Sequence, residues 1–270
     1  MTDPKYKLKH IRFKSNQRFA PTRVHNIVLE LYKWAVSDYS CYRIINSFFD
    51  SNRNNNETQL VINSRIEDLK DEQEVIYNNS VNIDSFNELK RLLLSLFNNN
   101  LSAQDYRMIY SYYLEYITMR WRRTPGRFGK VVYEPLIKYK RKELFGNKDF
   151  SKSKCDVVYK NNRDKSLYIY ECKFGLSTFF YHLRVNINTA TGRLKKNGIR
   201  ANRKIQYLEE CNNVFKTSSD VINLDVKIVT LATRSSIISS VGLLRGIDLM
   251  TRDELEAKDF YDLLKIKESS

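Results

Sequence analysis

A carboxylate and an ammonium group stand two residues apart at the end of an apolar run. The run is YIYECKFG, and its last strand-like residues are Glu171, Cys172 and Lys173. Because successive side chains of a strand point to opposite faces, Glu171 and Lys173 share one face and Cys172 lies on the other. A carboxylate in a sheet costs several kcal/mol unless its charge is compensated. Glu171 and Lys173 therefore form either an ordinary ion pair at a strand end or part of a functional site.

The sequence predicts that a second carboxylate lies close to Glu171. Two apolar runs around the polar turn KNNRDK predict a β-hairpin over residues 154–174, which brings Asp156 close to Glu171. Two converging carboxylates are compensated most simply by a divalent cation, and oxygen ligands select Mg²⁺ or Mn²⁺. A lysine beside such a metal can steady a phosphate oxygen or help to activate water.

The positive charge of the chain is concentrated around this hairpin. The net charge is +15, from 46 Lys and Arg and 31 Asp and Glu. Residues 120–204 hold 23 basic and 6 acidic residues, so the remainder has a net charge of −2. A polyanion, and nucleic acid foremost, is the partner that such a segment fits. The side chains expected to bind backbone phosphates are Lys152 and Lys154, and in a predicted basic loop Arg193, Lys195, Lys196, Arg200, Arg203 and Lys204.

The order Glu134, Asp156, Glu171-Cys172-Lys173 resembles the PD-(D/E)xK nuclease superfamily over residues 124–236. Cys155 stands where the proline of the family's name would be. The resemblance implies a restriction-endonuclease-like core, in which a mixed central sheet is flanked by helices. It also implies Mg²⁺-dependent hydrolysis of phosphodiester bonds by Asp156, Glu171 and Lys173, with a helical glutamate, Glu134, upstream.

The chemistry assigns a role to each of these residues. Phosphodiester cleavage needs a positioned water, a metal that neutralises the phosphate and stabilisation of the leaving oxygen. We expect Asp156 and Glu171 to hold Mg²⁺ or Mn²⁺, together with the main-chain carbonyl of Cys172. Lys173 would orient or deprotonate the water, and Glu134 would support a second metal or hold metal-bound waters.

Hydrophobic periodicity predicts an α/β protein with three regions. Residues 1–23 are a basic arm, which we expect to reach nucleic acid. Residues 24–119 show helical spacing throughout and predict a helical domain for self-association, partner docking or target recognition. Residues 120–270 predict the nuclease-like domain, with a short helix carrying Glu134, the hairpin, a buried strand at 225–236 and a late strand and helix.

Composition limits the cellular setting. No apolar run approaches the roughly 20 residues that cross a bilayer, and we expect no membrane partner. The four cysteines are scattered without a CxxC spacing, which argues against a zinc site or a disulfide framework and favours a reducing cytoplasm.

The residues together predict a metal-dependent endonuclease that acts on nucleic acid. Double-stranded DNA is favoured over RNA, in restriction, anti-phage defence or a mobile element. We expect a homodimer or a partner protein, because cleavage of both strands usually needs two active sites brought together, most commonly in a two-fold dimer. One alternative is a catalytically inactive nuclease-like module that binds nucleic acid. The other is an interaction protein whose basic segment meets an acidic protein or a membrane surface, which leaves Asp156, Glu171 and Lys173 without a common task.

Overall fold

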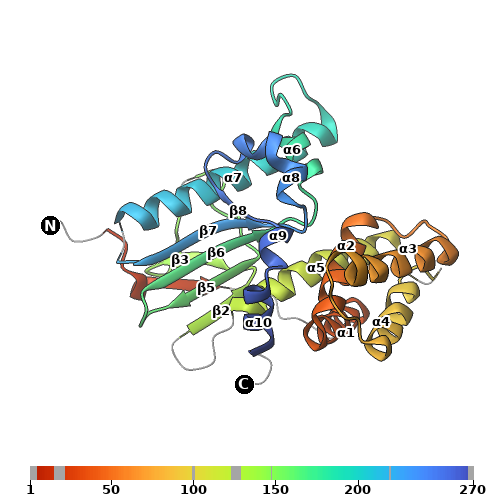
Figure 1. Cartoon of the computed structure of the whole chain (residues 1–270). Helices are drawn as coiled ribbons and strands as arrows, with labels where there is room; N and C mark the ends of the chain where they lie inside the picture. The colour runs from red at the N-terminus through yellow and green to blue at the C-terminus, as the bar shows by residue number, and fades with distance from the viewer. Residues whose placement is uncertain are drawn as a thin grey trace. The chain divides into compact units, whose positions relative to one another are not determined.

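The chain folds as two units, one built around β-sheets and the other from helices, and the fold class is mixed α/β (Figure 1). The sheet unit contains residues 1–18 and 122–251, and the helical unit contains residues 19–121 and 252–270. The computed structural model describes residues 5–14, 22–98, 101–122, 129–146, 148–218 and 220–266.

The helical unit has an aromatic core. Tyr42, Tyr106 and Tyr113 are fully buried, together with Phe48 and Phe49. Tyr106 and Tyr113, from a segment crowded with tyrosines, thus pack inside the helical unit. The helices are α1 (Arg23–Ser37), α2 (Tyr39–Ser51), α3 (Gln59–Asp71), the π-helical turn η2 (Glu72–Ile76), α4 (Ile83–Ser95), α5 (Ala103–Arg122), α9 (Arg252–Leu255) and α10 (Lys258–Ile266).

Side-chain caps set the ends of these helices. Thr22, Asp38 and Asn82 each accept a hydrogen bond from a backbone N–H in the first turn of the helix that follows. Asp38 has an extended backbone, and this residue divides the single apolar pattern of residues 24–49 into α1 and α2. Asn82 lies directly before α4 and accepts from the backbone N–H of Ser85.

A five-stranded mixed sheet forms the centre of the sheet unit, in the order β2-β5-β6-β7-β8. The expected hairpin is present, because β5 and β6 are antiparallel with Val157 opposite Tyr170. β7 and β8 continue the sheet in parallel. The strands are β2 (Gly129–Tyr133), β5 (Val157–Asn161), β6 (Ser166–Cys172), β7 (Asn223–Val229) and β8 (Asp248–Met250).

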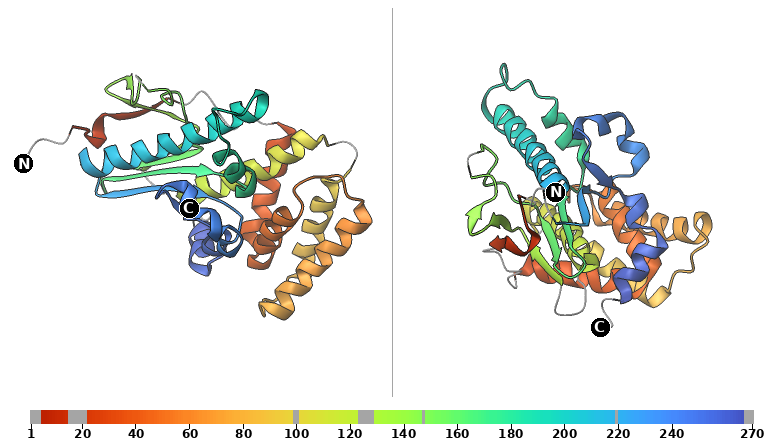
Figure 2. Two further views of the ribbon diagram at one scale, coloured as in Figure 1. Left: turned by 90° about the horizontal axis from the view of Figure 1, so that it is seen from above. Right: turned by 90° about the vertical axis from the view of Figure 1, so that its left-hand side faces the viewer.

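One long helix, α7 (Gly192–Ser218), lies along a face of this sheet (Figure 2). Ile205, Leu208 and Phe215 of α7 share a core with Val158 and Ile169 of the hairpin. A small sheet, in the order β1-β3-β4, adds to the same core. Its strands are β1 (Ile11–Lys14), β3 (Leu136–Tyr139) and β4 (Lys142–Glu143), and shorter elements are η1 (Leu8–His10), α6 (Leu176–Leu183), α8 (Arg234–Ile237) and η3 (Ile238–Leu244).

Two of the elements that the sequence predicts are different in the structure. The helix expected around Glu134 is absent, because residues 129–133 and 136–139 are strands, in keeping with their β-branched residues and with Pro135 between them. The basic loop expected at residues 191–204 is the first half of α7. Lysine and arginine are good helix formers, and Ala201, Ile205 and Leu208 repeat at helical spacing to anchor it.

The unit boundaries also differ from the expected regions at both ends of the chain. Leu8 and Ile11 of the basic arm are buried in the core of the sheet unit, so residues 8–14 are part of that unit. Residues 15–21 of the arm lie outside the described residues. The C-terminal residues from Arg252 belong to the helical unit. In the described part of the chain, no helix has the length and apolar character to cross a bilayer.

The packing of α7 on the hairpin predicts a large penalty for a cavity there. Ile169 is fully buried, whereas 71% of Ile238 on η3 is exposed. We expect Ile169→Ala to lower the free energy of unfolding by about 2–5 kcal/mol, measured by urea denaturation. The matched Ile238→Ala change should stay within about 0.5 kcal/mol of the wild type. Equal losses for the two variants would contradict this core assignment.

Candidate active site

The hairpin brings Asp156 and Glu171 to the same end of the sheet. Val157 lies opposite Tyr170, so the next pair of this antiparallel register is Asp156 and Glu171, on one face of the sheet. The backbone N–H of Cys172 donates to Asp156 Oδ2 at 2.7 Å, which fixes this carboxylate beside the end of β6. The spatial convergence of the two carboxylates follows from the register alone.

Glu171 is buried, with 1% of its surface exposed, and two ammonium groups share its charge. Lys173 Nζ donates to Glu171 Oε1 at 2.5 Å, and Lys204 Nζ donates to Glu171 Oε2 at 2.8 Å. Lys204 comes from α7 and also donates to the main-chain oxygen of Lys154. The backbone N–H of Lys173 donates to Val229 O at 2.8 Å, so β7 holds the residue in place.

The two carboxylates have opposite pKa shifts. Burial and the negative charge of Glu171 together raise the pKa of Asp156 to about 7. Burial also raises the pKa of Glu171, but the ammonium groups of Lys173 and Lys204 outweigh it, so that pKa is lowered. Burial lowers the pKa of Lys173, yet Glu171 and Asp156 raise it well above its usual value. At neutral pH without metal, Glu171 and Lys173 are charged and Asp156 is partly protonated.

The oxygen atoms of this site are the kind of ligand that Mg²⁺ prefers. The described residues contain no group of three or more His, Cys, Asp or Glu side chains arranged to hold a metal. Two carboxylates and the main-chain oxygen of Cys172 are nevertheless all oxygen donors, and Cys172 O lies 3.4 Å from Lys173 Nζ. Mg²⁺ is typically held by one or two carboxylates and keeps several waters. Asp156, Glu171 and Cys172 O therefore fit this cation.

Glu134 lies next to Asp156, beyond the end of the edge strand β2. Its backbone N–H donates to Asp156 O at 2.8 Å, one residue past the end of β2. The backbone of Glu134 has a φ of 41°, which lies in the left-handed region that residues other than glycine rarely adopt. The strand register brings this glutamate to Asp156 without the expected helix.

A pocket of about 270 Å³ opens beside the paired lysines. Lys173 and Lys204 line it on the side of the carboxylates, and Arg200 lines it from one turn earlier on α7. His182 Nδ1, from α6, is buried without a hydrogen-bond partner in the described structure. The pocket is also lined by Phe179, Asn197 and Ala201. These donors around an apolar floor suit a phosphate and the nucleoside attached to it.

The other cations of the predicted set are spread along α7 and the segment before β5. Lys204 and Arg200 converge on the site, and Lys154 contributes a main-chain oxygen to it. Arg203 pairs with Asp149 at 4.0 Å. Lys152, Arg193, Lys195 and Lys196 are exposed.

Sequence reasoning missed the placement of Lys204 on Glu171 and the contribution of α6. The apolar spacing of residues 201–208 was the available signal, because it makes residues 200–204 part of a helix that packs on the sheet. Which helical residue meets which strand residue is a matter of tertiary packing.

The raised pKa of Asp156 predicts a pH dependence of stability in the metal-free protein. Between its usual pKa of 3.8 and the folded value of about 7, the folded protein binds the proton more tightly. The contribution of Asp156 to stability therefore falls as the pH rises through this window. Asparagine keeps an acceptor for the Cys172 N–H without the charge. We expect the melting temperature of Asp156→Asn, minus that of the wild type, to increase between about pH 4 and pH 7 in EDTA and then to level off.

The exposed Asp248→Asn change is the control for the loss of one negative charge. A difference for Asp156→Asn that stays constant over the same range would contradict the buried, negatively charged setting of this carboxylate.

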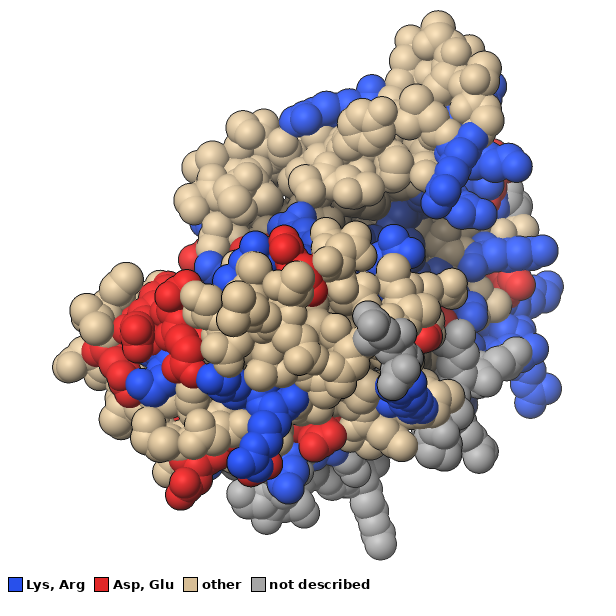
Figure 3. All heavy atoms as spheres, turned by 90° about the vertical axis from the view of Figure 1, so that its right-hand side faces the viewer, with Lys and Arg blue, Asp and Glu red and all other residues tan. Residues whose placement is uncertain are grey.

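The two units differ in charge as well as in structure. The sheet unit holds 32 basic and 12 acidic residues, a net charge of +20, and the helical unit holds 14 basic and 19 acidic residues, a net charge of −5. Figure 3 shows Lys and Arg side chains gathered in one dense patch of the surface and Asp and Glu side chains in a separate one. Comparison of the chain with protein-family models, characterised proteins and solved structures finds no match.

Proposed function

We propose that the protein is a metal-dependent endonuclease of the PD-(D/E)xK type that hydrolyses phosphodiester bonds in DNA. The observation that carries this proposal is the convergence of Asp156 and Glu171 with Lys173 at one end of the sheet. The cross-strand register makes Asp156 and Glu171 neighbours, and the unit that holds them has a net charge of +20. A purely structural ion pair between Glu171 and Lys173 has no need of Asp156.

Each residue of the site has a separate role in the proposed reaction. Mg²⁺ bound by Asp156, Glu171 and Cys172 O would neutralise charge on the phosphate and acidify a water. Lys173 stays protonated beside Glu171, which favours a role in holding a phosphate oxygen by its charge over a role in removing a proton. Lys204 keeps Glu171 ionised and oriented from the opposite side.

The first turns of α7 supply the proposed contact to the nucleic-acid backbone. Arg193, Lys195 and Lys196 are exposed there, and Arg200 of the same helix lines the pocket beside the site. Contacts of this kind position a nucleic acid without reading its sequence. α7 would thus connect phosphate binding at its start to Glu171 at its middle.

Removal of any of the three central side chains should abolish cleavage. We expect Asp156→Asn, Glu171→Gln and Lys173→Ala each to reduce the rate of plasmid cleavage in Mg²⁺ by about 10²–10⁴-fold, because each removes a charge that the transition state requires. The control is Lys216→Ala, which removes an exposed lysine from the far end of α7 and should cut at the wild-type rate. Gel assays with plasmid, linear and single-stranded substrates, in Mg²⁺, Mn²⁺ or EDTA, measure these rates.

The same assay separates the proposal from its alternative, an inactive nuclease-like module. Metal-independent binding without cleavage of any substrate would favour the inactive module. Cleavage by Lys173→Ala at the wild-type rate would overturn the active-site assignment, provided that circular dichroism shows the variant to be folded.

The exposed cations of α7 predict a strong salt dependence of binding. Each phosphate contact contributes about 0.9 to the slope of log affinity against log salt. We expect the triple alanine variant of Arg193, Lys195 and Lys196 to lower this slope by up to about 3, measured by fluorescence anisotropy with a labelled duplex in EDTA.

The matched control removes three arginines of the helical unit that pair with carboxylates, Arg53, Arg65 and Arg91. This control should leave the slope unchanged. An unchanged slope in the α7 variant would move the phosphate-binding surface elsewhere.

A further inference from the structure

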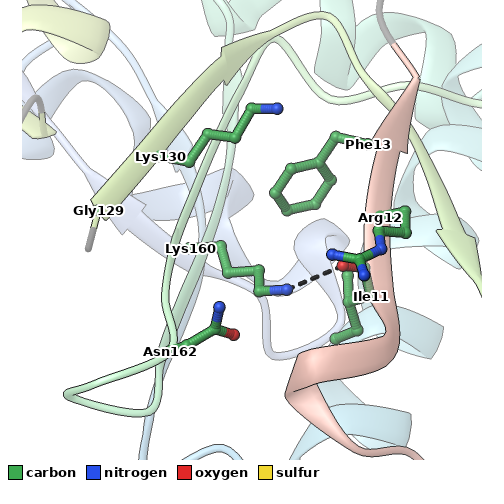
Figure 4. A pocket seen from close by; sticks show the side chains of 7 residues that line it. All are labelled: Ile11, Arg12, Phe13, Gly129, Lys130, Lys160 and Asn162. Atoms are coloured by element: carbon green, nitrogen blue, oxygen red, sulfur yellow. Dashed lines mark hydrogen bonds between the residues drawn. The ribbon is translucent and has the colours of Figure 1, made fainter. Parts of the chain in front are cut away.

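A second basic pocket lies between three strands of the sheet unit, away from the candidate active site. It has a volume of about 190 Å³ and is lined by Arg12 of β1, Lys130 of β2 and Lys160 of β5. Figure 4 shows these three side chains reaching into one space, with the ring of Phe13 and the amide of Asn162 beside them. Three segments that are distant in sequence thus direct cations into one small cavity.

The described residues that line this pocket carry positive charge without a carboxylate among them. In the part of the chain that the structure describes, Arg12, Lys130 and Lys160 form no ion pair. Lys160 is buried, and its Nζ donates to Ile11 O at 2.8 Å, which uses one of its three N–H groups. Buried ammonium groups are seldom left with only a neutral acceptor.

The pKa of Lys160 also reflects the positive charge of the pocket. Burial, together with the charges of Arg12 and Lys130, lowers the pKa of Lys160 to about 8, against the opposing effect of Asp220. The carboxylate of Asp220 accepts a hydrogen bond from Leu8 N at 2.5 Å, so it is engaged with the backbone of η1. An anion in the pocket would relieve the repulsion among the three cations.

We propose that the pocket formed by Arg12, Lys130 and Lys160 binds a phosphate group. A phosphate carries one to two negative charges and several acceptor oxygens, which match three cationic side chains and the Asn162 amide better than a single carboxylate does. The volume of about 190 Å³ accommodates a phosphate group.

The position of the pocket also fits the backbone of a bound nucleic acid. Lys160 follows Asp156 by four residues, and alternate residues of a strand share a face, so both point to the same side of the sheet. At about 3.3 Å per residue, their Cα atoms are separated by ~13 Å, roughly the axial rise of four nucleotides of one DNA strand. The phosphate can therefore come from the nucleic-acid backbone, which rests on the proposed function, or from free phosphate or a mononucleotide, which does not.

The test removes the two exposed cations of the pocket and leaves the buried one in place. Arg12→Ala combined with Lys130→Ala takes away two charges without disturbing the hydrogen bond from Lys160 to Ile11. The matched control is Lys142→Ala combined with Lys216→Ala, two exposed lysines of the same unit outside the pocket. All measurements are made in EDTA, so they do not depend on whether the protein cleaves nucleic acid.

Two probes are used on the full-length protein. Inorganic phosphate is titrated by calorimetry and by its effect on melting temperature, with chloride at equal ionic strength as the reference. A labelled DNA duplex is titrated by anisotropy at several salt concentrations. We expect the pocket variant to bind phosphate at least tenfold more weakly than the control variant, and to lose about one unit of the salt slope for the duplex.

The outcomes distinguish the two sources of phosphate. Loss of both phosphate affinity and salt slope identifies the ligand as a backbone phosphate. Loss of phosphate affinity with an unchanged duplex slope identifies it as a free phosphate or mononucleotide. If the pocket and control variants have the same phosphate affinity and the same salt slope, the proposal is overturned, whatever the cleavage assays show.

Discussion

The buried carboxylate of Glu171, held between two ammonium groups, is the interaction on which the sheet unit depends. One ammonium comes from the end of the same strand and the other from Lys204, at the middle of α7. A buried charge that loses one partner typically costs about 3–5 kcal/mol, so this triad acts together with the apolar core to hold α7 on the sheet. The same triad keeps Glu171 ionised, which is the state in which it can bind a cation.

The two carboxylates of the site have opposite pKa shifts because their surroundings differ. Glu171 has a lowered pKa because two lysines contact it, whereas the pKa of Asp156 rises because it is buried beside a negative neighbour without an equivalent partner. Neighbouring acids with divergent pKa values are a common feature of active sites. Asp156 lacks the ammonium contacts that Glu171 has, so the proposed Mg²⁺, bound beside it, would favour its ionised form.

Phosphate recognition by the sheet unit would extend well beyond the reacting group. The pocket of Arg200, His182 and Phe179 adjoins the lysines of the site, and the pocket of Lys160 lies at the opposite end of β5. Contacts on both sides of a reacting phosphate would hold a nucleic-acid strand in register, because each fixes a different point of its backbone. The net charge of +20 on this unit would attract the polyanion before either pocket is engaged.

Local sequence determined the hairpin and the convergence of Asp156, Glu171 and Lys173, because the alternation of strand residues is encoded over a few neighbours. It misled where tertiary context outweighed composition: Glu134 follows a strand, and the basic stretch before Lys204 is helical. The partnership of Lys204 with Glu171 spans 33 residues, and the pocket of Arg12 and Lys160 joins segments 148 residues apart. Such contacts depend on how α7 and β1 pack on the sheet, and that packing arises from the whole core, so no local pattern contains it.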